Sequence, residues 1–207
     1  IRTLLNRLFK MRMNAWAFEN PSYKKASIQY SSFLNATGVL LCSVELLPGK
    51  MEKGISEFIA QQEQIFRYGF TRAEIERAKK VIYNNLENKL QNQQNPTSIE
   101  LMNDVYADFY VGNRFTSLQE EYQLVQLYFP EIDSVALARN LAKVYSPRKM
   151  HYLLRANEKA DKEVGGDMTL MAIIKEARKQ SLERYNKHVS VPDELCQFPS
   201  GGHVVKE

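Results

Sequence analysis

The segment "YGFTRAEIERAKKVIYNN", residues 68–85, holds the clearest local signals in the chain. Gly69 is typical of the residue that ends a helix, and Thr71 followed by Glu74 is the capping box that begins another. In such a box the threonine hydroxyl accepts from the backbone amide three residues on, and the glutamate accepts from the cap amide, which stabilises the helix by about 1 kcal/mol. The segment therefore predicts one helix ending before Gly69 and a second beginning after Thr71.

The acids and bases of this segment raise the question of a catalytic cluster. Glu74 and Glu76 are two residues apart, so on a helix their side chains point about 200° away from each other and cannot form a carboxylate pair. Glu76 precedes Lys80 by four residues, the favourable order for an ion pair on a helix surface. The pattern indicates a capped, charged helix face and no catalytic site.

Further helices follow from the same kind of signal. Thr97 with Glu100 and Thr116 with Gln119 form two more capping boxes, and Asp133 is a good N-cap. Apolar residues also recur at helical spacing in residues 1–16, 51–68 and 167–185, and in the first of these Arg2, Arg7, Lys10 and Arg12 lie off the apolar stripe.

Three segments have the alternation of apolar and polar residues expected of strands: residues 27–34, 38–47 and 149–157. The first two are joined by "NATG", which favours a hairpin. Strands grouped apart from helices predict an α+β fold, an antiparallel sheet covered by a layer of helices. Three strands are few for so many helices, so either strands precede residue 1 or a small sheet carries a mostly helical layer.

Composition excludes several classes of protein. The 207 residues are 44% hydrophobic and 25% charged, as in ordinary globular domains. The net charge of +4 is spread along the chain, which disfavours nucleic-acid binding, and no run of about 18 apolar residues predicts a membrane span. The chain begins without methionine inside an amphipathic pattern and stops after a loop, so we expect it to be a piece of a longer protein.

Residues capable of catalysis or metal binding are isolated. His151, His188 and His203 lack the spacing that presents two imidazoles to zinc, and no nucleophile elbow or phosphate loop occurs. Cys42 and Cys196 are far apart, and Cys42 lies in an apolar run where a cysteine usually acts as a small buried side chain. The sequence leaves their redox state open, and it predicts no catalytic, cofactor-binding or metal-binding residues.

Tyr106, Phe109 and Tyr110 form an aromatic stripe at helical spacing. Such a stripe packs into a core far more often than it stacks on bases or binds peptides. We therefore interpret these residues as part of the core.

The ordered signals resemble the pitrilysin/insulinase family of zinc metallopeptidases. The helix ending in "IFRYGFT" and continuing as "RAEIERAKKVIYNNLE" is similar to that family's glycine–hydrophobic–threonine turn, and "NPTSIELMNDVYADFYVGN" and "EEYQLVQLYFPEIDSVALARNLAKVYSP" follow in the family's order. The resemblance covers about residues 4–207. The matched residues of the turn are Gly69, Phe70, Thr71, Glu74, Ile75, Ala78 and Lys79.

This resemblance implies repeated α+β domains, of which the catalytic one carries an HxxEH zinc motif and its companions do not. The present chain has no HxxEH, so it resembles a non-catalytic companion domain, with zinc expected only in the catalytic domain of the parent. It implies a partial domain over residues 1–160, a helix and linker toward a following domain over 161–207, and initial strands missing before residue 1.

The expected role is to form part of a chamber that encloses peptides and to dock the catalytic domain, with no peptidase activity in the chain itself. Its expected partners are the catalytic domain and the following half of the parent, and peptide substrates in the assembled enzyme. One alternative is a structural relative of the family that is not a peptidase. A further alternative is an independent α+β binding module whose basic residues bind its partner. An open sheet edge predicts edge-to-edge dimers, and the resemblance favours the bacterial periplasm or cell envelope.

Overall fold

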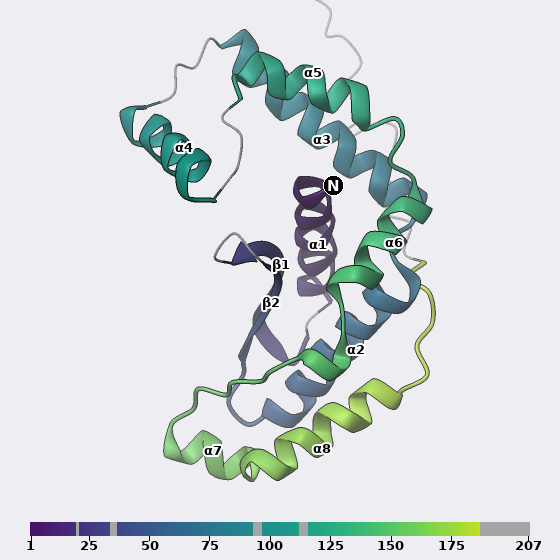
Figure 1. The fold of residues 1–207 in the computed structure, drawn as a ribbon. Helices are drawn as coiled ribbons and strands as arrows, with labels where there is room; N and C mark the ends of the chain where they lie inside the picture. Colours follow the sequence, from purple (N-terminus) through teal and green to yellow (C-terminus); the bar gives the residue numbers. More distant parts are fainter. Residues whose placement is uncertain (20, 34–36, 93–96, 112–115, 187–207) are drawn as a thin grey trace, which may run out of the picture.

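The computed structural model describes residues 1–19, 21–33, 37–92, 97–111 and 116–186. It has the predicted α+β class, with a two-stranded antiparallel sheet among helices (Figure 1). No described helix is both long enough and apolar enough to cross a bilayer. In chain order the elements are α1 Arg2–Ala17, β1 Tyr23–Phe33, β2 Thr37–Leu46, α2 Met51–Tyr68, α3 Arg72–Gln91, α4 Ser98–Val111, α5 Leu118–Tyr128, α6 Ser134–Val144, a 3-10 turn Pro147–Lys149, α7 Glu158–Val164 and α8 Gly166–Lys179.

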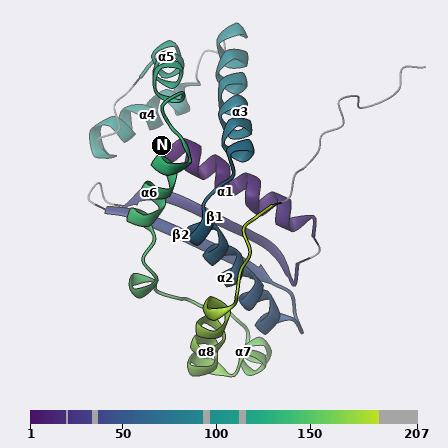
Figure 2. The same ribbon diagram turned by 90° about the vertical axis from the view of Figure 1, so that its right-hand side faces the viewer.

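Two apolar cores hold these elements together. The larger one joins α1, α2, α3 and the hairpin to parts of α5 and α6, and the smaller one joins α2 to α7 and α8. Figures 1 and 2 place α7 and α8 beside α2, at the end of the molecule away from α4 and α5. Helix α2 approaches the start of β1 so closely that a Cβ on Gly54 would lie 2.6 Å from the Ser22 carbonyl oxygen, which only glycine permits.

The local capping signals are largely correct. Thr71 and Glu74 form the predicted box at the start of α3, and Thr97 and Glu100 form the predicted box at α4. Gly69 ends α2 with a positive φ of 68°, and Asp133 caps α6.

The predicted box of Thr116 and Gln119 is wrong by one residue. Ser117 caps α5 instead, and its box partner is Glu120. The Glu120 carboxylate accepts from the Ser117 N–H (2.7 Å), and a charged acceptor binds an amide more strongly than the neutral side chain of Gln119 would. Leu118, Tyr122 and Val125 of this helix pack against the larger core.

The third predicted strand, over residues 149–157, is also wrong. Residues 150–156 have no regular secondary structure, although the backbone at Met150 is extended (φ −84°, ψ 134°). A segment counts as a strand only when it joins a ladder, and no described strand pairs with it.

The last helix is shorter than its periodicity predicts, because α8 ends at Lys179 and an unpredicted short helix, α7, precedes it. Beyond α8, side chains of α2 donate hydrogen bonds to backbone carbonyl oxygens. Tyr68 Oη donates to the carbonyl oxygen of Leu182 (2.7 Å), and Gln64 Nε2 donates to that of Glu183 (2.9 Å). These bonds hold the chain in a non-helical path along α2. The predicted linker lies mostly beyond Asn186, outside the described residues.

The aromatic stripe is not part of the core. Tyr106, Phe109 and Tyr110 on α4 are 59%, 79% and 58% exposed, and their rings contact one another. No described residue of α4 is buried, so this prediction is wrong. The apolar side chains of α4 form an exposed surface.

Arg12 is buried in the core, which its position in the sequence does not predict. It lies off the apolar stripe of α1, yet it is 1% exposed and binds Glu74 with two bonds of 2.6 Å, from Nε and Nη2. Its guanidinium also lies over the Tyr185 ring, 3.7 Å from the centroid. Glu74 thus caps α3 and ties it to α1. Its neighbour Glu76 pairs with Lys79 (3.1 Å) and not with Lys80, which corrects the predicted pair.

Candidate functional site

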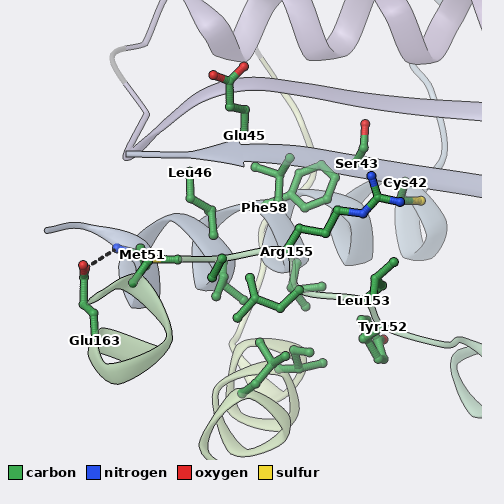
Figure 3. Close-up of a pocket in the computed structure, with 18 of the residues that line it drawn as sticks. Cys42, Ser43, Glu45, Leu46, Met51, Phe58, Tyr152, Leu153, Arg155 and Glu163 are labelled. Carbon is green, nitrogen blue, oxygen red and sulfur yellow. Dashed lines mark hydrogen bonds between the residues drawn. The ribbon is translucent and has the colours of Figure 1, made fainter. Parts of the chain in front are cut away.

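A cavity of about 1040 Å³ lies between β2 and the segment 150–157 (Figure 3). One wall is the edge of β2 from Leu40 to Leu46, and the other wall is the extended segment. Helices α2, α7 and α8 close it from below, with a floor made mainly of Met51, Ile55, Ile59, Leu170 and Ile174.

At Tyr30, the outward-facing backbone groups of β1 bond to α1. Asn6 Nδ2 donates to the Tyr30 carbonyl oxygen (2.9 Å), and the Tyr30 N–H donates to Asn6 Oδ1 (2.8 Å). Since the N–H of Tyr30 is bound to Asn6, it does not bond β2. Tyr30 and its partner Leu40 are therefore a non-hydrogen-bonded pair of the ladder.

The Tyr30–Leu40 pair fixes which residues of β2 turn their backbone groups toward β1 and which turn them away. Opposite residues of an antiparallel ladder alternate between bonded and non-bonded pairs, so Ile28–Cys42 and Ala26–Val44 are non-bonded pairs as well. The N–H and C=O groups of Leu40, Cys42 and Val44 therefore point away from β1, toward the cavity. No described strand pairs with this edge.

The opposite wall has strand character without a strand partner. Tyr152 and Leu154 are half-buried against the smaller core, whereas Leu153 between them is 80% exposed. Among the described residues, no backbone-to-backbone hydrogen bond reaches residues 150–156. Both walls of the cavity thus carry peptide groups that pair with no backbone group of the part of the chain that the structure describes.

Glu63 on α2 anchors this wall to the helices below it. It is 5% exposed, accepts a hydrogen bond from Tyr145 Oη, and pairs with Arg178 Nε (3.2 Å) and Arg67 Nε (3.4 Å). Arg178 Nη2 in turn donates to Tyr152 Oη (2.6 Å). Burial, with the neighbouring Glu63 carboxylate, raises the pKa of Tyr145, so its hydroxyl stays a donor.

Glu163 of α7 closes one end of the cavity. Its carboxylate accepts from the N–H groups of Gly49 and Met51, each at 3.1 Å, and Figure 3 shows the bond with Met51. It thereby ties α7 to the turn between β2 and α2. The two anchors, Glu63 and Glu163, hold the floor and the second wall in place around the cavity.

The side chains that line the cavity include one thiol, that of Cys42, and one imidazole, that of His151. Burial raises the pKa of the Cys42 thiol to about 12, so it remains protonated and weakly nucleophilic near neutral pH. As expected from its apolar surroundings, Cys42 is partly buried against the larger core. His151 lies exposed at the cavity.

The remaining histidines and the second cysteine, His188, His203 and Cys196, lie outside the described residues. In the described part of the chain, no three His, Cys, Asp or Glu side chains gather into a set that could hold a metal ion.

The sequence does not predict this cavity. Its walls come from residues more than a hundred positions apart, and neither wall carries a motif. The one sequence signal at this cavity is the alternation of apolar and polar residues over 149–157. It is a strand pattern, and no described strand pairs with it.

Cys42 gives a prediction for alkaline solution. Its ordinary pKa of 9.0 applies to the unfolded chain, and burial raises the folded value to about 12. The stabilising contribution of the protonated thiol is therefore complete below pH 9.0 and is lost as the pH rises toward 12. We expect the free energy of unfolding to fall between neutral pH and about pH 10, and to fall by about 1–2 kcal/mol more in wild type than in Cys42→Val. Urea titrations at the two pH values measure this difference. Equal losses in the two proteins would contradict the buried thiol.

Comparison with known proteins supports the fold. No family model matches the chain, and no curated protein matches it. Among solved structures, the periplasmic protease PqqL from Escherichia coli superposes with a TM-score of 0.75 at 20% identity, over 89% of this chain and 21% of PqqL.

Two other proteases have similar folds, with lower TM-scores than that of PqqL. A predicted insulinase family protease from Yersinia pestis has a TM-score of 0.59 at 13% identity, over 86% of this chain and 38% of its own. The ferredoxin protease FusC, solved with Arabidopsis ferredoxin, has a TM-score of 0.58 at 10% identity, over 89% of this chain and 21% of its own. The chain spans about a fifth of the length of PqqL and FusC. It shares the insulinase-like α+β fold of these proteases.

Proposed function

We propose that this chain is a non-catalytic domain of a zinc-dependent metalloendopeptidase of the pitrilysin/insulinase family. It forms part of the wall of a chamber that encloses peptides, and it docks the catalytic domain. The observation that carries the proposal is the superposition on PqqL over 89% of the chain, in a sequence that contains no HxxEH motif. The zinc ion belongs to the catalytic domain of the parent protein, so the chain itself needs no cofactor.

Helix α4 supports a docking role. Met102, Val105 and Phe109 are 65%, 60% and 79% exposed, although a soluble domain normally buries a set of large apolar side chains on one helix. The partners in this proposal are the catalytic domain and the following half of the same parent chain. The periplasmic origin of PqqL favours the bacterial periplasm or cell envelope for the parent.

The proposal is tested on the parent protein. Its gene should encode HxxEH about one domain upstream of residue 1, and the purified parent should cleave unfolded peptides. Deletion of residues 1–207 should abolish cleavage while the zinc content of the remaining protein stays at one per chain. Loss of the zinc on deletion would place a ligand in this domain and overturn the proposal. A parent without HxxEH would instead favour a structural relative that is not a peptidase.

The open edge of β2 predicts self-association of the isolated chain. Unpaired strand edges pair with one another when nothing covers them, and β2 has no strand partner among the described residues. We expect the weight-average mass in light scattering to rise with protein concentration toward that of a dimer. Leu41→Lys, on the exposed face of β2, should reduce this rise by adding charge beside the edge. A monomer at millimolar concentration would contradict the prediction.

A further inference from the structure

We propose that residues 180–185, here called the strap, open and close as a unit while both apolar cores stay folded. In the closed state the strap leaves the end of α8 and runs back along α2, and Tyr185 covers the buried Arg12–Glu74 pair (Figures 1 and 2). Opening uncovers this pair and loosens the tie between α1 and α3. Every contact in this inference lies within the described chain, and none depends on the proposed peptidase role.

The middle of the strap is attached to α2 by side chains of that helix. Tyr68 Oη donates to the carbonyl oxygen of Leu182 (2.7 Å), and Gln64 Nε2 donates to that of Glu183 (2.9 Å). The two donors are four residues apart on α2, so they lie on one face of the helix. Within the described chain, no backbone-to-backbone hydrogen bond reaches residues 181–185. The strap is therefore held by a few side-chain bonds and not by secondary structure.

The start of the strap is attached in the same way. Arg67 donates to the carbonyl oxygens of Arg178 and Gln180, and Gln180 Nε2 donates to Ser56 Oγ (3.1 Å). All the bonds between α2 and the strap are exposed to solvent, where water competes for the same groups, so each contributes little net stability. A segment held by such bonds opens at a lower free energy than the cores it joins.

The far end of the strap contacts the larger core through an aromatic ring. Tyr185 is half-buried, and its ring packs edge-on against Trp16, with 6.1 Å between the ring centroids. The guanidinium of Arg12 lies 3.7 Å from the centroid of the Tyr185 ring. The closed ring keeps water from this cation, which strengthens its attraction to Glu74. Tyr185 is thus the latch of the strap.

The attachments of the strap depend on one another. A single residue, Arg184, separates Glu183 from Tyr185, and its guanidinium lies over the ring of Tyr68 (5.9 Å). Because one residue spans at most about 3.5 Å, a strap that leaves the donors of α2 also withdraws Tyr185 from its cation. The buried residues of both cores all lie before residue 178, so they stay packed when the strap opens.

The test uses the full 207-residue chain at a concentration where it is monomeric, with its single tryptophan, Trp16, as a reporter. The double variant Gln64→Met, Tyr68→Phe removes the two donors of α2 with little change in volume. We expect trypsin to cleave after Arg184 about tenfold faster than in wild type, because cleavage follows the population of the open form. The indole N–H of Trp16 should exchange with solvent faster by the same factor, as measured by NMR.

The reverse experiment starts from the latch. Tyr185→Ala should speed trypsin cleavage after Lys179, at the other end of the strap, also by about tenfold. The matched control Gln123→Met, Tyr128→Phe makes the same two replacements at exposed positions of α5 and should leave all these rates unchanged. The amides of Leu8 and Phe9, which lie on the buried face of α1, should exchange as in wild type in every variant.

Three results would overturn the proposal. Unchanged rates in the double variant would show that the bonds from α2 do not hold the strap. Faster cleavage after Arg184 without faster indole exchange at Trp16 would show that the strap frays from one end and does not open as a unit. Equal acceleration of the Leu8 and Phe9 amides would show that the strap opens only when the whole domain unfolds.

Discussion

Replacing Arg12 with alanine should lower the free energy of unfolding by about 3–5 kcal/mol, the range measured when one partner of a buried ion pair is removed. The side chain of Arg12 is fully buried, and that of Glu74 is 18% exposed. Without Arg12, the Glu74 carboxylate loses both 2.6 Å bonds in a place where water reaches it poorly. The aromatic rings of Trp16, Phe70 and Tyr185 also lose the cation that lies among them.

Paired variants separate the ion pair from simple packing. Arg12→Met together with Glu74→Leu removes both charges and should recover most of the stability, since an apolar replacement of a buried pair is often neutral. Lys10→Ala, on the exposed side of the same helix, should change the unfolding free energy by less than about 0.5 kcal/mol. Urea denaturation followed by circular dichroism measures all three. A loss for Arg12→Ala no larger than that for Lys10→Ala would contradict the buried pair.

Replacing Glu63 with alanine should cost about 3–4 kcal/mol, because it leaves the charge of Arg178 without its partner and Tyr145 without its acceptor. Glu63 is nearly inaccessible to solvent, and its carboxylate joins α2 to α8 and to the end of α6. The same substitution frees the second wall of the cavity, since Arg178 holds Tyr152. We therefore expect a loss of global stability and faster amide exchange at residues 150–154.

The matched control is Glu176→Ala on α8. Its ion pair with Lys179 is 3.9 Å long, and both side chains are more than 70% exposed, so its removal should cost less than about 0.5 kcal/mol. Thermal and urea denaturation provide the stabilities, and hydrogen exchange provides the local effect. Equal stabilities of the two variants would show that Glu63 does not anchor the wall.

Local chemistry explains why most helix boundaries could be predicted. The box of Thr71 and Glu74 involves residues three apart, and the bonds form wherever that short segment becomes helical. Gly69 ends α2 for a similarly local reason, a positive φ. The misplaced box at α5 shows the limit, since two neighbouring residues can cap and the box forms with the charged side chain of Glu120.

Long-range partners explain what could not be predicted. Arg12 is off the apolar stripe of its own helix, and its burial depends on Glu74, sixty-two residues later. The alternation over residues 149–157 is a genuine strand pattern, yet the structure places no described strand beside it. The aromatic stripe of α4 likewise has the spacing of a core helix, and its neighbours in the described chain leave it exposed. Periodicity shows which face of an element is apolar and leaves open what covers that face.

The cavity lies between two segments that pair with no further strand of the described chain. The free edge of β2 and the unpaired segment 150–156 were both expected to lie in a sheet, and the distance between them in the sequence concealed that they face one cavity. Asn6, a polar residue of α1, bonds the outward-facing backbone groups of Tyr30 on β1, and no motif marks that role.

The proposal that this chain is a non-catalytic domain is tested most directly by metal analysis of the purified 207-residue chain. After refolding with excess zinc and desalting, we expect less than about 0.1 zinc ion per chain by mass spectrometry, because three well-placed ligands are needed for a catalytic zinc site. The same preparation should leave a fluorogenic peptide uncleaved. One tightly bound zinc ion per chain, with chelator-sensitive peptide cleavage, would contradict the assignment of a non-catalytic domain.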